Sequence, residues 1–167
     1  MIENHLKSLI DSYKKSKSFI FNQVDYSNPS EENITEIKKK LLNTGFTRNL
    51  YEYQLENLFK LINIPNGANF SVPGSGKTAV SLGIIALNDS KITFVIVPNK
   101  GVMVSWVDDI NDSFTEASKP NVIEITTESS RQMRNLFEGV DRKTIFLITY
   151  DKISRNKETF SIFKKFL

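Results

Sequence analysis

Cysteine is absent from the 167 residues of the chain, and histidine occurs once, as His5. The lack of cysteine excludes disulfides, cysteine-ligated zinc fingers and thiol catalysis, and a single histidine excludes a histidine-rich metal site. No run of about 18 apolar residues is present, so no membrane span is predicted. The first 15 residues have the pattern of an amphipathic helix and lack the apolar core of a secretory signal. We therefore expect a cytoplasmic protein with no membrane partner.

The chain also has only a small excess of positive over negative charge. The chain has 22 Lys+Arg and 19 Asp+Glu residues, which gives a formal net charge of +3. This excess permits a nucleic-acid partner without demanding one. Hydrophobic residues make up 40% and charged residues 25%, as in folded proteins, and the length suits one domain with a helical appendage.

The first third of the chain is expected to be helical. Apolar residues recur at helical spacing from Leu6 onward, and a second helix is predicted to begin after a capping Ser30 and to end near Gly45. A third helix is predicted from Leu50 to Ile62, with one apolar face made of Leu55, Leu58, Phe59 and Ile62. We assign residues 1–49 to a helical N-terminal extension.

Strands and helices are expected to alternate from residue 68 onward. Short apolar segments predict strands at residues 68–71, 92–97, 122–125 and 144–149. Helices are predicted at residues 78–87, 102–114 and 130–137, and again from the last strand to the C-terminus. This order predicts an α/β fold, a parallel sheet with helices on both faces.

One glycine-rich segment carries a phosphate-binding pattern. Residues 71–78 (SVPGSGKT) match the Walker A motif G-x-x-x-x-G-K-[ST], except that Ser71 replaces the first glycine. Gly74 and Gly76 permit backbone angles that turn successive N–H groups toward an anion, and the following helix adds its positive dipole end. Lys77 can reach the β- and γ-phosphates, and the Thr78 hydroxyl can coordinate Mg²⁺. The segment therefore predicts binding of ATP with Mg²⁺.

Four segments together resemble the motifs of superfamily-two helicases. Residues 50–54 (LYEYQ) resemble the Q motif, whose glutamine reads the adenine edge, and residues 72–78 resemble motif I. Residues 95–98 (VIVP) with Trp106 resemble motif Ia of the Swi/Snf-like branch, and residues 147–153 (LITYDKI) its later Thr-Tyr motif. The resemblance implies a first RecA-like lobe over residues 50–167. It also implies a nucleotide site of Tyr53, Gln54, Pro73, Gly74, Ser75, Gly76, Lys77, Thr78 and Ala79.

The same resemblance implies an activity and partners. In this family the loops after motif Ia and the Thr-Tyr motif hold the backbone of one nucleic-acid strand, and the matching residues here are Asn99, Lys100, Gly101, Thr149 and Tyr150. Amides, hydroxyls and lysine suit phosphate without reading sequence. The resemblance implies an ATP-driven helicase or translocase on duplex DNA, with Lys77 and Thr78 as catalytic residues. It further implies a second RecA-like lobe of the parent chain and a place in restriction or phage defence, with defence-complex subunits as partners.

One motif of the family is missing, and two alternatives stay open. Motif II, a strand ending in Asp-Glu, is expected after residue 167, which implies a piece or truncation of a longer motor that hydrolyses ATP poorly alone. The first alternative is a non-catalytic interaction or regulatory module. The second is another P-loop ATPase in which Asp151, after an apolar strand, is a degenerate Walker B carboxylate. Against the second, Lys152 stands where a catalytic glutamate is needed.

Overall fold

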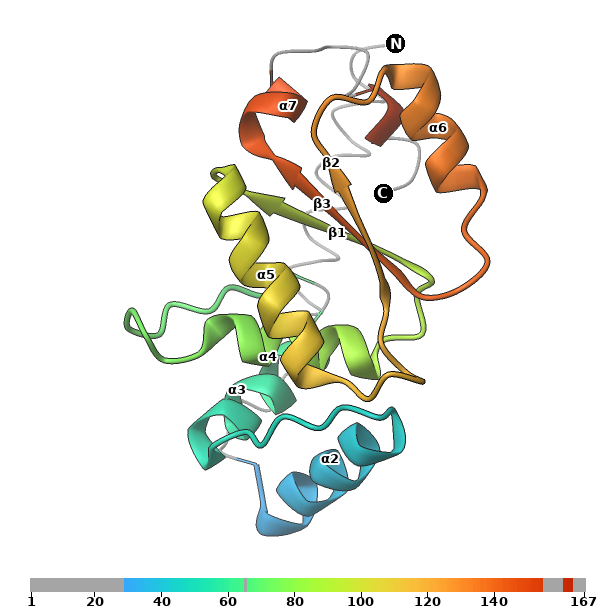
Figure 1. Ribbon diagram of the computed structural model, residues 1–167. Helices are drawn as coiled ribbons and strands as arrows, with labels where there is room; N and C mark the ends of the chain where they lie inside the picture. Colours follow the sequence, from blue (N-terminus) through green and yellow to red (C-terminus); the bar gives the residue numbers. More distant parts are fainter. Residues whose placement is uncertain (1–28, 65, 155–160, 164–167) are drawn as a thin grey trace, which may run out of the picture.

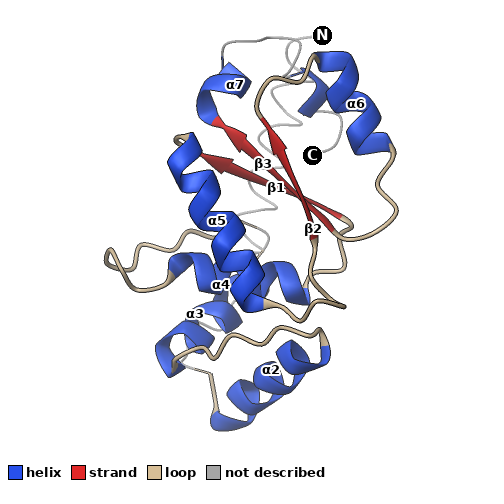
Figure 2. Ribbon diagram, in the orientation of Figure 1, coloured by secondary structure: helices blue, strands red, loops and turns tan. Residues whose placement is uncertain are grey.

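The structure, a computed structural model, describes residues 29–64, 66–154 and 161–163. Within these residues three helices come first, α2 (Glu31–Asn43), α3 (Glu52–Ile62) and α4 (Lys77–Leu87). Strands and helices then alternate as β1 (Ile92–Val97), α5 (Lys100–Ser113), β2 (Asn121–Ile125), α6 (Ser130–Glu138), β3 (Thr144–Thr149) and α7 (Tyr150–Ser154) (Figure 2). The helix predicted from Leu6 onward and most of the predicted C-terminal helix lie outside the described residues.

The described strands form one parallel sheet in the order β1-β3-β2. Strand β3 lies in the centre, with Val97 of β1 opposite Thr149 and Ile125 of β2 opposite Ile148. Its buried pattern explains this place, because residues 144–148 are all buried, as expected for a strand covered on both faces. The predicted α/β fold with a parallel sheet is confirmed.

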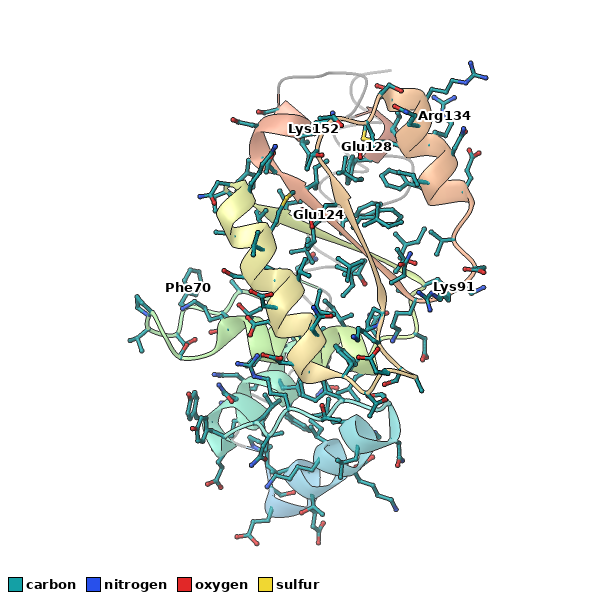
Figure 3. The ribbon with its side chains drawn as sticks, viewed as in Figure 1. Phe70, Lys91, Glu124, Glu128, Arg134 and Lys152 are labelled. Carbon is teal, nitrogen blue, oxygen red and sulfur yellow. The ribbon has the colours of Figure 1, made fainter. Side chains whose placement is uncertain are left out.

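The strand predicted at residues 68–71 is wrong, because this segment is irregular in the structure. The side-chain oxygen of Asn69 accepts hydrogen bonds from the backbone N–H of Ser71, at 3.0 Å, and from its hydroxyl, at 2.6 Å. Such local bonds compete with the ladder of a sheet. The segment runs through a loop that extends away from the sheet, and Phe70 on this loop is 92% exposed (Figures 1 and 3).

Apolar residues cover the sheet on both faces. One cluster joins helices α2 to α5 to the sheet through Ile145 and Leu147, and Trp106 of α5 packs half-buried against it. The opposite face carries Phe146 and Ile148 with α6, and four phenylalanine rings meet there, those of Phe94, Phe137, Phe146 and Phe163. Figure 1 shows α5 across the sheet, with α2, α3 and α4 at one end of the molecule and α6 at the other. The prediction of helices on both faces is confirmed.

Two helices begin with the same reciprocal cap, and a third has one half of it. Ser30 caps α2 as predicted, and Ser129 caps α6, because each hydroxyl accepts the backbone N–H three residues later. At α6 the side-chain oxygen of Gln132 in turn accepts the Ser129 N–H at 2.8 Å. Gln54 accepts the Tyr51 N–H at 2.9 Å in the same way at α3. These bonds satisfy N–H groups that have no partner inside the helix.

Lys143, the residue before β3, ties the sheet to the end of α4. Its Nζ donates hydrogen bonds to the carbonyl oxygens of Ile85 (3.0 Å), Ala86 (3.2 Å) and Asn88 (2.6 Å). The last carbonyls of a helix lack intrahelical donors, and a cation there also favours the negative end of the helix dipole. Burial lowers the pKa of Lys143, and the nearby charge of Asp89 opposes that shift.

We expect Lys143→Met to lower the free energy of unfolding by about 1–3 kcal/mol, because the donor to three carbonyls is lost while the side-chain length is kept. The pKa of Lys143 is lower in the folded chain than the ordinary lysine value of 10.5, which applies to the unfolded chain. Stability of the unmodified chain therefore rises between the two pKa values, and the variant lacks this rise. Urea unfolding of both chains from about pH 7 to about pH 10 measures both effects. If the difference between their free energies of unfolding becomes smaller as the pH rises, this account is contradicted.

None of the helices that the structure describes has the length and apolar character needed to cross a bilayer.

Candidate nucleotide-binding site

The loop that precedes α4 is bent by two glycines. Gly74 and Gly76 have φ angles of 80° and 77°, in the left-handed region that side chains rarely adopt. Between them, the Ser75 N–H donates to the Val72 carbonyl at 3.2 Å. Gly76 is the N-cap of α4, so the first N–H groups of this helix, from Lys77 onward, have no intrahelical partner. The predicted bend and the predicted helix start are therefore both present.

Ser75, at the apex of this loop, is held from two sides. Its carbonyl oxygen accepts a hydrogen bond from Nε2 of Gln54 at 2.9 Å and one from the hydroxyl of Tyr53 at 3.1 Å. Its own hydroxyl donates to the hydroxyl of Ser71 at 2.8 Å. The residues that resemble the Q motif thus contact motif I directly, across 21 residues of sequence for Gln54.

Gln54 has both ends of its amide bonded inside the protein. Oε1 accepts the Tyr51 N–H and Nε2 donates to Ser75, and the side chain is only 5% exposed. The ring of Tyr53 is stacked on that of Tyr51, with centroids 5.9 Å apart and planes 7° apart, and both rings are exposed. The adenine contact predicted for Gln54 stays a prediction.

Lys77 points its ammonium group back at the loop. Nζ donates to the carbonyl oxygens of Ser71 at 2.7 Å and of Val72 at 2.9 Å. A lysine held by the carbonyls of its own phosphate loop can exchange these partners for phosphate oxygens, which form stronger charge-assisted bonds.

Ser71, which stands in place of the first Walker A glycine, forms a hydrogen bond within the loop, because its hydroxyl accepts the Ser75 hydroxyl.

The remaining predicted nucleotide residues lie around this loop. Thr78 and Ala79 occupy the first turn of α4, Thr78 half-buried and Ala79 buried, and Pro73 is exposed in the bend. Among the described residues, no group of three or more histidine and carboxylate side chains could hold a metal ion. The donor set instead suits a magnesium ion that arrives with its phosphates, since one hydroxyl on a helix start and a lysine on a glycine bend match that chemistry.

The predicted nucleic-acid residues come together at one edge of the sheet. Strands β1 and β3 are parallel and paired through Val97 and Thr149, so Asn99, Lys100 and Gly101 follow β1 where Thr149 and Tyr150 end β3. Asn99, Lys100, Gly101 and Tyr150 are exposed. The Asn99 side chain also caps α5, since its Oδ1 accepts the Val102 N–H at 3.1 Å.

The loop after β2 adds residues to this edge that the sequence interpretation missed. The Glu128 carboxylate accepts the N–H groups of Thr126 and Thr127, at 2.6 and 2.9 Å, and Lys152 of α7 donates to the Glu128 carbonyl at 2.8 Å (Figure 3). Their position directly after a strand was the available signal. Asp151 is exposed in the first turn of α7, and its role as a Walker B carboxylate stays a prediction.

A glycine bend that enters a helix start, beside a parallel sheet covered on both faces, is typical of P-loop nucleotide-binding domains, and the family match below places this one in the superfamily-two helicase-like class. The chain belongs to the ResIII family, described as type III restriction enzyme, res subunit, whose family model matches residues 31–166. It is thus a helicase-like ATPase module, of a family described from restriction enzymes. No curated protein matches the chain.

Proposed function

We propose that this chain is the ATP-binding part of a DNA translocase, in which ATP hydrolysis drives movement along duplex DNA in restriction or phage defence. We further propose that its motor belongs to the Swi/Snf-like branch. That finer assignment is supported by residues 95–98 with Trp106 and by the Thr-Tyr pair after β3. The observation that carries the proposal is the bend of Gly74 and Gly76 with Lys77 turned toward it.

The proposed nucleotide contacts follow from the chemistry of the loop. Backbone N–H groups of Gly74 and of Gly76, Lys77, Thr78 and Ala79 bind the phosphates, and Pro73 and Ser75 shape the bend. Lys77 moves from the carbonyls of Ser71 and Val72 to the phosphate oxygens, and Thr78 presents its hydroxyl to magnesium. The base lies on the side where Tyr53 and Gln54 contact Ser75.

The catalytic contribution proposed for this chain is positioning and charge stabilisation. Bound magnesium would neutralise charge on the phosphates. Lys77 and Thr78 would hold the phosphates and the magnesium ion in position. A second RecA-like lobe of the parent protein and defence-complex subunits are the proposed partners. Closure of that lobe against this one would complete the hydrolytic site.

The proposed DNA contacts are supported by the shared edge of β1 and β3. Backbone amides, the Thr149 and Tyr150 hydroxyls and the Lys100 ammonium group are suited to sugar and phosphate rather than to base edges. These residues lie together where two paired parallel β-strands end, so they can contact neighbouring phosphates of one DNA strand. Contacts of this kind have no sequence preference.

We expect the full chain to bind a fluorescent ATP analogue in a magnesium-dependent manner and to bind duplex DNA with an affinity that falls as salt rises. Lys100→Ala is expected to weaken DNA binding about two- to fivefold at every sequence and to reduce the salt slope by about 1. Lys91→Ala is the matched control, since Lys91 is exposed directly before β1, at the opposite edge of the sheet.

Two results would contradict the proposal. One is no magnesium-dependent ATP binding at concentrations up to about 1 mM, the upper end of ordinary substrate affinities. The other is equal loss of DNA binding in Lys100→Ala and Lys91→Ala, which would mean that the sheet edge has no special role.

A further inference from the structure

Gln54 connects two parts of the molecule that are otherwise separate in sequence. Its Oε1 accepts the Tyr51 N–H at the start of α3, and its Nε2 donates to the Ser75 carbonyl at the apex of the phosphate loop. Helix α3 is itself firmly placed, because Leu55 and Leu58 are buried in the cluster that joins α2 to α5. The amide therefore anchors a bent loop to a fixed helix.

The space around Gln54 leaves little room for another partner. The side chain is 5% exposed, and a Cβ on Gly76 would overlap Nε2. Reading a base edge would require the amide to turn outward and to give up both of its present bonds. Turning outward leaves the Tyr51 N–H without its acceptor and the Ser75 carbonyl with the Tyr53 hydroxyl alone, and the loss of these two bonds costs free energy.

We propose, on the basis of the proposed function, that Gln54 is a positioning residue for the phosphate loop and does not select the base. It holds Ser75 so that the loop keeps its bend before the nucleotide arrives, and the phosphates gain affinity because this ordering is already present. Loss of Gln54 then weakens every ligand that carries the triphosphate, whatever its base.

The test compares Gln54→Met with Gln132→Met in the full chain. Both substitutions remove a glutamine that accepts the N-cap N–H of its helix, but only Gln54 also contacts the phosphate loop. The ligands are ATP, GTP and inorganic triphosphate, each with Mg²⁺. We expect Gln54→Met to weaken all three by the same factor, roughly three- to tenfold, and Gln132→Met to change none.

A second measurement needs no ligand. Hydrogen exchange of the Ser75 and Val80 amides, whose N–H groups donate to the Val72 and Gly76 carbonyls, is expected to become faster in Gln54→Met and also in Gln54→Glu. The glutamate can still accept the Tyr51 N–H but has no proton to donate to Ser75, so it separates the loop contact from the helix cap. In Gln132→Met the exchange of these amides is expected to stay unchanged.

Each outcome decides between the two roles. A loss confined to ATP, with inorganic triphosphate and loop exchange unchanged, would overturn the proposal and assign Gln54 to the adenine. Unchanged affinities and unchanged exchange would also overturn it. If the unmodified chain binds none of the three ligands, the proposed function fails, while the exchange measurement still tests whether Gln54 holds the loop.

Discussion

Replacing Lys77 with alanine is expected to abolish measurable Mg-ATP binding. The side chain places an ammonium group on the glycine bend, where Nζ already donates to the carbonyls of Ser71 and Val72. Two charge-assisted bonds to phosphate, each worth roughly 1.5–3 kcal/mol, would be lost, which is a factor of at least about 100 in affinity. Titration of the fluorescent ATP analogue against both chains measures the loss.

The controls for this result separate charge from fold. Lys77→Arg keeps the charge and is expected to retain part of the affinity, because guanidinium also binds phosphate. Lys119→Ala removes a lysine that pairs with Glu116 on the surface and is expected to leave ATP binding unchanged. If Lys77→Ala binds ATP as tightly as the unmodified chain, Lys77 is not in the site and the nucleotide assignment is lost.

Gly76→Ala is expected to damage the loop far more than Gly74→Ala. The two glycines have nearly equal φ angles, so alanine at either carries a backbone strain of about 1–2 kcal/mol. Around Gly74 there is open space for a Cβ, whereas at Gly76 the Cβ would overlap the Gln54 amide. Gly76→Ala therefore adds the loss of the Gln54 bonds, for a total of roughly 3 kcal/mol or more.

The measurement for this pair is the affinity for Mg-ATP together with urea unfolding of each variant. Most of the difference is expected in affinity, because the loop is exposed and forms little of the core. Equal losses for the two substitutions would show that strain alone decides the effect and that the contact between Gly76 and Gln54 is unimportant.

The sequence predicted the elements whose signal is local. The apolar segments of β1 and β3 identified two buried strands, and Ser30 identified the start of α2, because burial and capping depend on adjacent residues. The phosphate loop was also predicted, since its glycines and Lys77 lie within a few positions of one another. Apart from the strand at residues 68–71, the predicted bounds that fall on described residues differ from those observed by at most two residues, and those of β1 and β3 are the same.

The failures involve partners that lie far apart in sequence or compete locally. Residues 68–71 have a mixed pattern, and nothing in it ranks the local bonds of Asn69 to Ser71 above strand pairing. The contact of Gln54 with the Ser75 carbonyl spans 21 residues and involves a backbone atom, which no residue pattern specifies. The motifs identified the helicase-like class; the family match supports the restriction-enzyme context that the resemblance implied and leaves the Swi/Snf-like branch as a proposal.

In the proposed translocase, the three hydrogen bonds of Lys143 have a mechanical consequence. They fasten the far end of α4, whose near end carries Lys77, to the base of β3, whose other end carries Thr149. We expect a helix and a central strand joined in this way to move together, so that the phosphate loop at one end and the sheet edge at the other shift as one body. A change at the bound nucleotide would then reach the sheet edge without a change in the distance between the phosphate loop and Thr149.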